Sequence, residues 1–367
     1  MSENYTMGVE EEFCIVDGTT GELKPRAGPV LNEVPPAIAE DVQAELNLSQ
    51  AETGTKVCRT LDEVRTDVIR LRRALAGAAE AAGCRVATVG THPRARWQDQ
   101  WLNRAKDRYR YLEEQFALTA REQLVNGCHV HVGFTDRDLA IAVLDRARVW
   151  MSPLLALSAN SPYWGGVDSG YASYRTQVWS QWPQSGLPEP LDSRSAYDRL
   201  IADLQRAEVL ADASFLYWDI RPSSRYETLE FRIADSCLTV DETVMVAGLV
   251  RAVARTAAAE AEAGTAVPVV RSALLRGAKW KAARFGLQGD LVDVTRGQSA
   301  PAPEIVGRLL DTLRPALEEF GDWETVRALV EETLRRGNGA QRQRAAFARR
   351  ENLDDVVELI LAETADG

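Results

Sequence analysis

The stretch MGVEEEFCIV, residues 7–16, decides the fold, because it is typical of a β-strand yet carries three successive carboxylates. Its aromatic and β-branched residues favour a strand, and Asp17-Gly18 ends it with a turn signal. Side chains alternate across a strand, so Glu10 and Glu12 share one face and Glu11 lies on the other. Two carboxylates about 7 Å apart on one face repel each other unless a cation lies between them. The stretch is therefore either an edge strand whose charges deter aggregation or one wall of a metal site.

Composition excludes several classes of protein. The 367 residues suffice for a large core, and 43 basic against 54 acidic residues give a net charge of −11. This balance argues against a nucleic-acid or anionic-membrane binder, because such binding depends on Lys and Arg. The five cysteines are odd in number and scattered, which is typical of reduced thiols. No signal-peptide pattern and no apolar run of membrane-span length is visible, so we expect a cytoplasmic protein.

Three later segments are expected to form strands that carry further charged or imidazole side chains. Residues 41–52, DVQAELNLSQAE, alternate so that Glu45 lies opposite the apolar residues, and Glu52 follows. Residues 126–134, NGCHVHVGF, place His129 and His131 on one face of a buried strand. Alone, these could be two hydrogen-bonded core histidines.

Residues 228–233, TLEFRI, place Glu230 and Arg232 together on one face. Such a pair is most often a surface ion pair. Arg221, in a neighbouring strand expected over 217–221, supplies a second guanidinium.

The rest of the chain is expected to be mainly helical. Apolar spacing predicts helices over residues 61–82, 139–157, 195–210, 243–263, 271–285, 304–320, 323–336 and 340–362. A short strand is expected over 85–90, and residues 158–190 read as a long Gly-, Pro- and aromatic-rich loop, which is usually functional. We expect one catalytic domain over 1–367, with sheet and helix mixed in 1–238. Residues 239–367 would be a helical layer on the sheet or a small helical subdomain.

Together the predicted strands present five carboxylates, two imidazoles and an arginine in face-sharing pairs. Carboxylate-rich sites suit Mg²⁺ or Mn²⁺ completed by nucleotide phosphates. Arginines neutralise the charge on a transferring phosphoryl group. The sequence contains no GxxxxGK[ST] motif, so a P-loop enzyme is excluded.

Five ordered segments resemble one known family. GVEEEF, ELNLSQAETGT, NGCHVHVGF, LSANSPYWGGVDSGYASYRT and ETLEFRIADS are similar to the short bacterial glutamate–cysteine ligase type 2 family, also called carboxylate–amine ligases, from about residue 6 to about residue 360. The resemblance implies an α+β, glutamine-synthetase-like catalytic domain. In that fold a curved, mainly antiparallel sheet forms a funnel with helices packed outside, and two or three Mg²⁺ ions lie between ATP and an amino acid.

The resemblance also implies roles for individual residues. The expected metal ligands are Glu10, Glu12, Glu45, Glu52, His129 and Glu230. The expected nucleotide-binding residues are His131, Arg232, Lys279 and Arg284, although the last two also fit an ordinary basic helix face. The expected substrate-binding residues are Asn160, Tyr163, Tyr174, Arg175 and Arg221, and Arg232, Arg221 and Glu230 are expected to be catalytic.

The reaction implied is ATP-dependent amide formation through an acyl phosphate, with L-glutamate and L-cysteine as the reference substrates. A ligase with another acid and amine, and a non-catalytic nucleotide-binding homologue, remain alternatives; the guanidino kinases share the broad fold, but their phosphate site is not recognisable here. We expect small-molecule partners only, with a homodimer left open. Glu10→Gln or Glu230→Gln is expected to abolish turnover and leave the fold intact by relieving charge repulsion.

Overall fold

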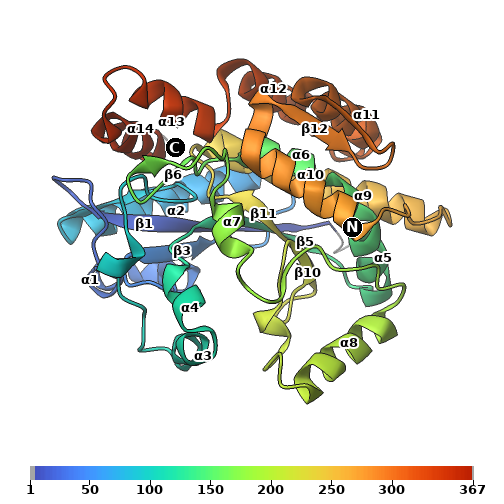
Figure 1. Ribbon diagram of the computed structural model, residues 1–367, viewed down its shortest axis with the longest axis horizontal. Coiled ribbons are helices and arrows are strands. Elements are labelled where there is room, and N and C mark those ends of the chain that lie inside the picture. Colours follow the sequence, from blue (N-terminus) through green and yellow to red (C-terminus); the bar gives the residue numbers. More distant parts are fainter. Residues whose placement is uncertain (1–4, 366–367) are drawn as a thin grey trace.

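The acidic strand lies at the centre of the main sheet. The computed structural model describes residues 5–365. In it, β1 (Met7–Asp17) pairs with three other strands of a seven-stranded antiparallel sheet (Figure 1). The strand order is β10 (Ile220–Pro222), β11 (Thr228–Asp235), β5 (Gly127–Gly133), β1, β3 (Gln50–Gly54) and β2 (Val42–Ala44), and β4 (Cys84–Ala87) pairs with the second half of β1. This position excludes the edge-strand interpretation of the three glutamates.

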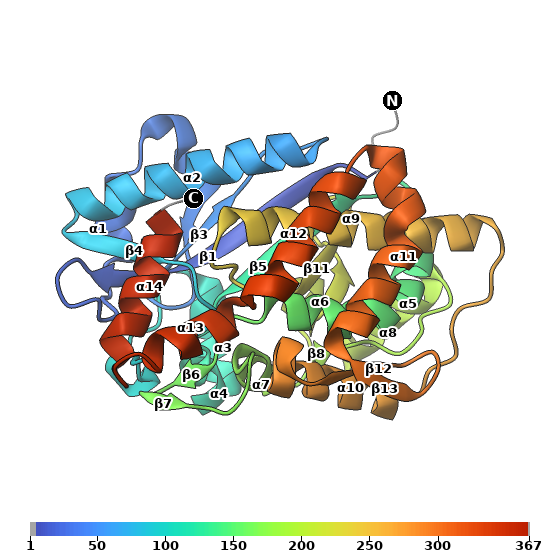
Figure 2. The ribbon, with the colours of Figure 1, turned by 90° about the horizontal axis from the view of Figure 1, so that it is seen from above.

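One face of the sheet is covered by helices. α2 (Leu61–Ala81) and α9 (Val240–Glu262) run side by side across it in Figure 2, and α5 (Arg137–Ala147) packs on α9. The apolar side chains of β1 and β5 on this face join the largest core cluster, with Val9 and Val130 fully buried. The predicted alternation of β1 and β5 is therefore confirmed.

Glu11 is the one carboxylate of the triplet on this covered face, and it is fully partnered. Arg72 of α2 donates from Nη2 to Glu11 Oε1 at 2.7 Å and from Nε to Oε2 at 3.0 Å. The hydroxyl of Thr243 on α9 donates to Oε1 at 2.6 Å. A buried carboxylate needs such a set of donors. The network thus ties β1 to both covering helices.

The remaining elements surround this core. The other helices are α1 (Ala27–Asn32), α3 (Asp107–Phe116), α4 (Leu118–Glu122), α6 (Met151–Ser158), α7 (Arg175–Trp179), α8 (Arg194–Arg206), α10 (Ser272–Phe285), α11 (Ala302–Phe320), α12 (Trp323–Arg336), α13 (Gly339–Phe347) and α14 (Leu353–Ala365). Short pairs are formed by β6 (Tyr163–Trp164) with β7 (Val167–Asp168), β8 (Ser185–Gly186) with β9 (Tyr217–Trp218), and β12 (Asp290–Asp293) with β13 (Gln298–Pro301). In Figure 1, α11 to α14 lie on one side of the sheet, and α3, α4 and α8 lie on the other.

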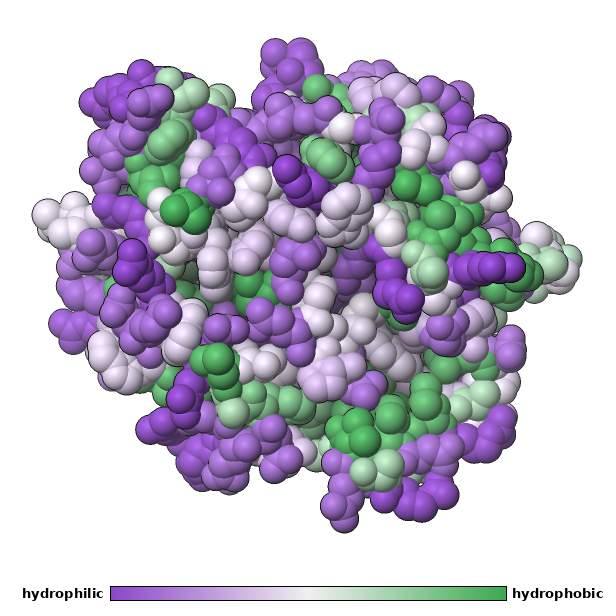
Figure 3. Space-filling view, viewed as in Figure 1, coloured by the Kyte–Doolittle hydropathy of each residue, from purple (hydrophilic) through white to green (hydrophobic). Residues whose placement is uncertain are grey.

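The polar character of the surface agrees with the charged content of the sequence, which is 26%. The side of the molecule in Figure 3 is largely hydrophilic, with its apolar side chains in separate patches. Within residues 5–365, the helices are all too short or too polar to cross a membrane.

Several predicted boundaries were wrong for local reasons. The helix expected over 340–362 is two helices, α13 and α14, because Glu351 adopts a left-handed φ of 53° and Asn352 accepts from the amide of Asp354 to start the second. The helix expected over 139–157 is broken earlier than its proline, by a 3₁₀ turn at Arg148–Trp150.

The strand expected over 41–52 is β2 and β3 with a turn between them. Gln50 Oε1 accepts from the backbone amide of Asn47 at 3.1 Å and from Asn47 Nδ2 at 2.8 Å, which closes that turn. Glu45 therefore lies just after a strand rather than within one. The strand expected over 217–221 is also divided, because Tyr217–Trp218 pairs with β8 and only β10 pairs with β11. The part beyond residue 238, expected to be helical, includes the β12–β13 hairpin.

Candidate metal centre

The open face of the sheet gathers the predicted ligands because the strand register aligns them. Glu10 lies opposite His129, Glu12 opposite Glu52, and His131 opposite Glu230. Directly opposed residues of antiparallel strands point to the same face. Residues far apart in the sequence therefore form one polar row across β3, β1, β5 and β11.

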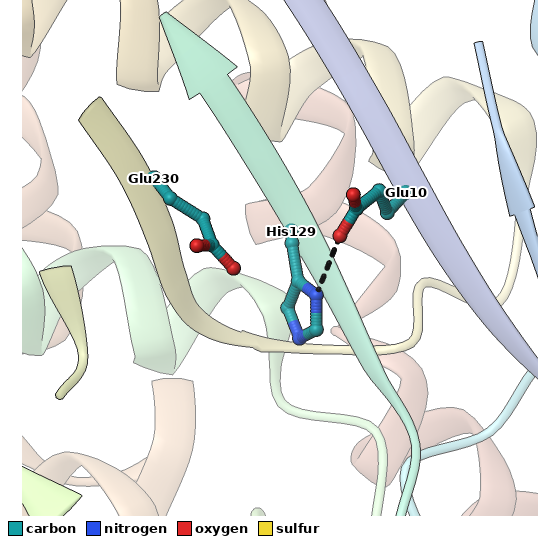
Figure 4. Close-up of side chains that lie close together, drawn as sticks. All are labelled: Glu10, His129 and Glu230. Atoms are coloured by element: carbon teal, nitrogen blue, oxygen red, sulfur yellow. Dashed lines mark hydrogen bonds and ion pairs between the residues drawn. The ribbon is translucent and has the colours of Figure 1, made fainter. Parts of the chain in front are cut away.

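Two groups of three side chains in this row are close enough to hold a metal ion. Glu10, His129 and Glu230 offer ligand atoms that lie within 4.8 Å of one another, and so do Glu12, Glu52 and His129 (Figure 4 shows the first group). His129 belongs to both groups, since its Nδ1 lies 3.2 Å from Glu10 Oε2 and its Nε2 lies 3.8 Å from Glu12 Oε1. The two groups are therefore two adjacent candidate cation sites.

The two histidines have opposite electrostatic environments. Burial, together with the charge of Arg232, lowers the pKa of His129 to about 4, so this imidazole is neutral and keeps a lone pair for a metal. Burial also disfavours the charged form of His131, but the carboxylates of Glu10, 3.4 Å from Nε2, and Glu230 together outweigh it and raise the pKa of His131. A histidine with a raised pKa suits an anion. The neighbouring imidazoles are thus prepared for different ligands.

Glu12 and Glu52 repel each other in the absence of a cation. Burial, followed by the charge of Glu45, raises the pKa of Glu12 to about 8. Burial and the charges of Glu10, Glu45 and Glu12 raise the pKa of Glu52 well above its usual range. Within residues 5–365, the protein places no side chain in an ion pair with Glu12 or Glu52 other than the imidazole of His129, so these two carboxylates are suited to bind a metal cation.

Glu230 has the reverse environment, because two arginines hold it. Arg221 donates from Nε to Glu230 Oε2 at 2.7 Å, and Arg232 forms an ion pair with Oε1. Burial would raise the pKa of Glu230, but the charges of Arg232 and Arg221 outweigh it and hold the pKa well below the usual range. Glu230 therefore stays ionised beside Glu10 and His129.

The row opens into a cavity of about 390 Å³. Its wall includes all the predicted metal ligands together with His131, Arg221 and Arg232. Glu45 reaches it from the turn after β2, where Tyr109 donates to its carboxylate at 3.2 Å. It belongs to neither group of candidate ligands found among the described residues.

Other predicted site residues lie outside the cavity wall. Lys279 is buried and donates to both carboxylate oxygens of Asp219, at 2.6 and 2.7 Å. Arg284 bonds to the carbonyl of Gly170 and stacks over Tyr171, on a separate surface hollow. The structure therefore does not bring these two cations to the metal row.

The predicted substrate-binding residues of the 158–190 segment also lie outside the cavity wall. Asn160 and Tyr163 are buried. Tyr174 packs against Trp164 and Tyr171. Arg175 Nη1 lies 3.9 Å from Asp235 Oδ1, and its Nη2 donates to the backbone oxygen of Arg232 at 3.2 Å.

Sequence reasoning missed part of the cavity wall. The residues it did not single out are Gln43, Leu46, Gln50, Lys106, Arg108, Tyr109, Leu112, Gln123, Val125, Trp179, Trp182, Ser214, Tyr217, Ser223, Ser224, Arg225 and Tyr226. Lys106 to Leu112 come from the start of α3, a segment that the sequence marks only by its charge and aromatic content. No strand alternation could have located them.

The residues present fit divalent metal ions. Nε2 of His129 and Nε2 of His131 are buried without a hydrogen-bond partner, although both rings lie among carboxylates. A buried polar atom left without a partner is costly, and a bound cation or phosphate would supply one. Oxygen ligands with one imidazole suit Mg²⁺ and Mn²⁺.

Comparisons with known sequences agree along nearly the whole chain. The family described as glutamate-cysteine ligase family 2 (GCS2) matches residues 6–359. A Frankia alni protein provisionally named glutamate–cysteine ligase 2-2 is 44% identical over 98% of this chain and 97% of its own length. One from Mycolicibacterium smegmatis, provisionally named glutamate–cysteine ligase 2-3, is 41% identical over 99% of each. A Frankia casuarinae relative is 45% identical over 98% of this chain, but the chain spans only 41% of that longer protein.

Solved structures share the fold. The glutamate–cysteine ligase of Francisella tularensis, solved in complex with AMP, superposes with a TM-score of 0.73 at 14% identity, covering 99% of this chain and 89% of that one. A bifunctional glutathione synthetase from Pasteurella multocida gives a TM-score of 0.71 at 16% identity, over 99% of this chain and 52% of that one. The predicted fold class, α+β with a mainly antiparallel sheet and helices outside, is confirmed.

Proposed function

Because the chain belongs to glutamate-cysteine ligase family 2, we propose that it is an ATP-dependent ligase that joins a carboxylate to an amine. The observation that carries the proposal is the row of two adjacent candidate cation sites sharing His129, with His131 and Arg232 beside them. An enzyme that transfers a phosphoryl group needs this combination of metal ligands and anion-binding cations.

The roles follow from the electrostatics. Glu10, His129 and Glu230 would hold one Mg²⁺, and Glu12, Glu52 and His129 would meet at a second, with Glu45 close by. Bound Mg²⁺ would neutralise phosphate charge. His131, with its raised pKa, and Arg232 would contact the phosphates of ATP. Arg221 would position Glu230 through their paired hydrogen bonds.

In the proposed reaction, the substrate carboxylate attacks the γ-phosphorus of ATP in line and ADP leaves. The amine then attacks the acyl carbon of the acyl phosphate, loses a proton and displaces phosphate to form the amide. The chain supplies positioning and charge complementarity rather than a side-chain nucleophile. Shielding by the aromatic wall of Trp179, Trp182 and Tyr217 would keep water from the acyl phosphate.

The names of the relatives favour L-glutamate as the acid and L-cysteine as the amine, with γ-glutamylcysteine as the product. A ligase of the same mechanism with a different acid and amine is the alternative. A non-catalytic homologue is disfavoured, because every residue of both candidate cation sites is in place.

The test is phosphate release from ATP with Mg²⁺ and L-glutamate, with and without L-cysteine and other amines. Release that requires both amino acids, with γ-glutamylcysteine identified by mass spectrometry, is the expected result. Release with another pair would keep the chemistry and change the substrates. Absence of release with every pair, despite ATP binding, would refute ligase activity.

A further inference from the structure

The cations that line the cavity differ in whether they form ion pairs with carboxylates of the protein. Arg221 and Arg232 both pair with Glu230. Arg175, which was expected to bind substrate, is buried outside the cavity wall beside Asp235. Both arginines expected to bind substrate, Arg175 and Arg221, therefore already lie in ion pairs with carboxylates of the protein.

Three other cavity cations, Lys106, Arg108 and Arg225, form no ion pair among the described residues, and of these only Arg225 is exposed. Lys106 Nζ donates to the carbonyl of Ala44 at 2.7 Å. Arg108 donates from Nη1 to Ser214 Oγ at 2.6 Å and from Nη2 to the Ser214 carbonyl at 3.1 Å. Neither Lys106 nor Arg108 forms an ion pair within the part of the chain that the structure describes.

This lack of ion pairs is specific to the residues that turn toward the cavity. On the same short segment, Arg104 pairs with Glu113 and Arg110 pairs with Asp107, both outside the cavity wall. Around the start of α3, the charged residues outside the cavity wall therefore form ion pairs with one another. The two cations of this segment that line the cavity, Lys106 and Arg108, remain available to bind an anionic ligand.

The geometry holds Arg108 in place. Its guanidinium carbon lies 4.1 Å from the centre of the Phe215 ring, and the planar group has N–H donors left after its two bonds to Ser214. The Ser214 carbonyl also accepts from Arg221 Nη1 at 2.9 Å, so the two arginines are neighbours. A fixed, half-buried and unpaired guanidinium is suited to a bidentate anion.

The location of Lys106 favours a carboxylate over the phosphates of ATP. Lys106 lies against Tyr109, whose hydroxyl bonds to Glu45, at the end of the row formed by Glu12 and Glu52. His131 and Thr228, 2.9 Å apart, mark the opposite end. The cavity wall also includes the apolar Leu112 and Val125 and the aromatic Trp182, which suit the body of a small organic substrate.

We propose that Arg108, assisted by Lys106, binds a substrate carboxylate other than the one that is phosphorylated. The proposal rests on the ligase function proposed above and assigns its substrates a class: at least one carries a carboxylate that is not phosphorylated, as an amino acid does, rather than being a simple amine or monocarboxylate. The carboxylate belongs either to the amine acceptor or to the acid.

The experiment compares substrates that differ only by that carboxylate. Turnover of wild type, Arg108→Gln and Lys106→Gln is measured with L-cysteine against cysteamine, and with L-glutamate against 4-aminobutanoate. Arg110→Gln, two residues along and outside the cavity, is the matched control. Arg108→Lys, which keeps the positive charge, distinguishes loss of the charge from a structural effect of replacing Arg108.

We expect Arg108→Gln to lower kcat/KM by about 10- to 100-fold for the substrate that carries the carboxylate and by little for its partner that lacks it. Loss in the cysteine pair assigns the carboxylate to the acceptor, and loss in the glutamate pair assigns it to the acid. The KM for ATP and the activity of Arg110→Gln should not change.

Equal losses with both members of each pair, or a loss confined to the KM for ATP, would overturn the proposal. If wild type shows no turnover with any pair, the ligase function fails first. Calorimetric binding of L-glutamate and L-cysteine in the presence of Mg²⁺ and a non-hydrolysable ATP analogue then tests Arg108 independently. Equal affinity of wild type and Arg108→Gln would refute the inference.

Discussion

Replacing Glu12 by glutamine should stabilise the metal-free protein, and by an amount that grows with pH. The folded protein raises the pKa of Glu12 from 4.5 to about 8, so the unfolded chain releases this proton at lower pH than the folded one. Stability is therefore lost as pH rises from 4.5 to 8. Since one pKa unit corresponds to about 1.4 kcal/mol, the raised pKa of Glu12 lowers the stability of the folded protein by about 2 kcal/mol at pH 6 and by about 4–5 kcal/mol at pH 8.5, relative to acid pH.

The assay is urea unfolding followed by tryptophan fluorescence, with a chelator present, at pH 6 and pH 8.5. The free energy of unfolding of Glu12→Gln relative to wild type should increase by about 2–3 kcal/mol between these pH values. With Mn²⁺ added, wild type should gain stability and Glu12→Gln should gain much less, because one oxygen ligand is lost.

Glu11→Gln is the matched control, because it changes the adjacent residue on the other face. It removes the charged partner of the buried Arg72, so we expect a loss of stability of about 3–5 kcal/mol. If Glu12→Gln lowers the free energy of unfolding, or changes it by the same amount at both pH values, then the carboxylate of Glu12 is not destabilising in the metal-free protein and the reasoning is refuted.

Three further outcomes follow from the same geometry. Glu230→Gln should abolish turnover. It should also lower the free energy of unfolding by about 3–5 kcal/mol, because it removes the carboxylate that pairs with both Arg221 and Arg232. A wild-type free energy of unfolding in urea would contradict this. Gly127→Ala should reduce turnover at least about 10-fold, because the new Cβ would lie 2.4 Å from Arg175 Nη2 and 2.9 Å from His129 Nε2. Gly54→Ala is the control and should stay active, because its new Cβ would meet no atom within 4 Å. Equal activities of the two variants would show that the added Cβ at position 127 does not disturb His129. The affinity for Mn²⁺, measured by calorimetry, should rise with pH up to about 8, since binding must displace the proton of Glu12; a flat profile would remove Glu12 from the ligand set.

The predicted effect of Glu10→Gln and Glu230→Gln on stability needs correction. The sequence shows that Glu10 and Glu12 share a face, but not which carboxylates are already balanced. Burial raises the pKa of Glu10, but the neighbouring imidazoles of His129 and His131 together outweigh it and lower that pKa, and two arginines do the same for Glu230. Relief of repulsion is therefore expected at Glu12 and Glu52 instead.

Alternation within a strand made the metal row predictable. Glu10, Glu12, His129 and Glu230 lie on one face because each belongs to a strand with a regular two-residue period, and the register then brings them together. Glu45 was misplaced because the side-chain bonds of Asn47 and Gln50 close a turn inside an apparently alternating segment. Periodicity does not report such a turn.

Residues outside the sheet were not predictable in the same way. Arg108 reaches the cavity through contacts with Ser214 and Phe215, which lie 106 and 107 positions further along the sequence. Lys279 looked available as a basic residue of an amphipathic helix, but Asp219 binds it in the interior. Such pairings depend on packing between distant segments, which no local pattern encodes.

The central position of β1 has a consequence for how the chain folds during synthesis. The strand is made first, yet its neighbours β3, β4 and β5 begin at residues 50, 84 and 127, so it must wait for partners far along the chain. Pairings between such distant segments form slowly. Until then a strand with apolar ends is open to association with other chains, and its three adjacent charges oppose this. The glutamates would thus protect the nascent strand before they hold metal in the finished protein.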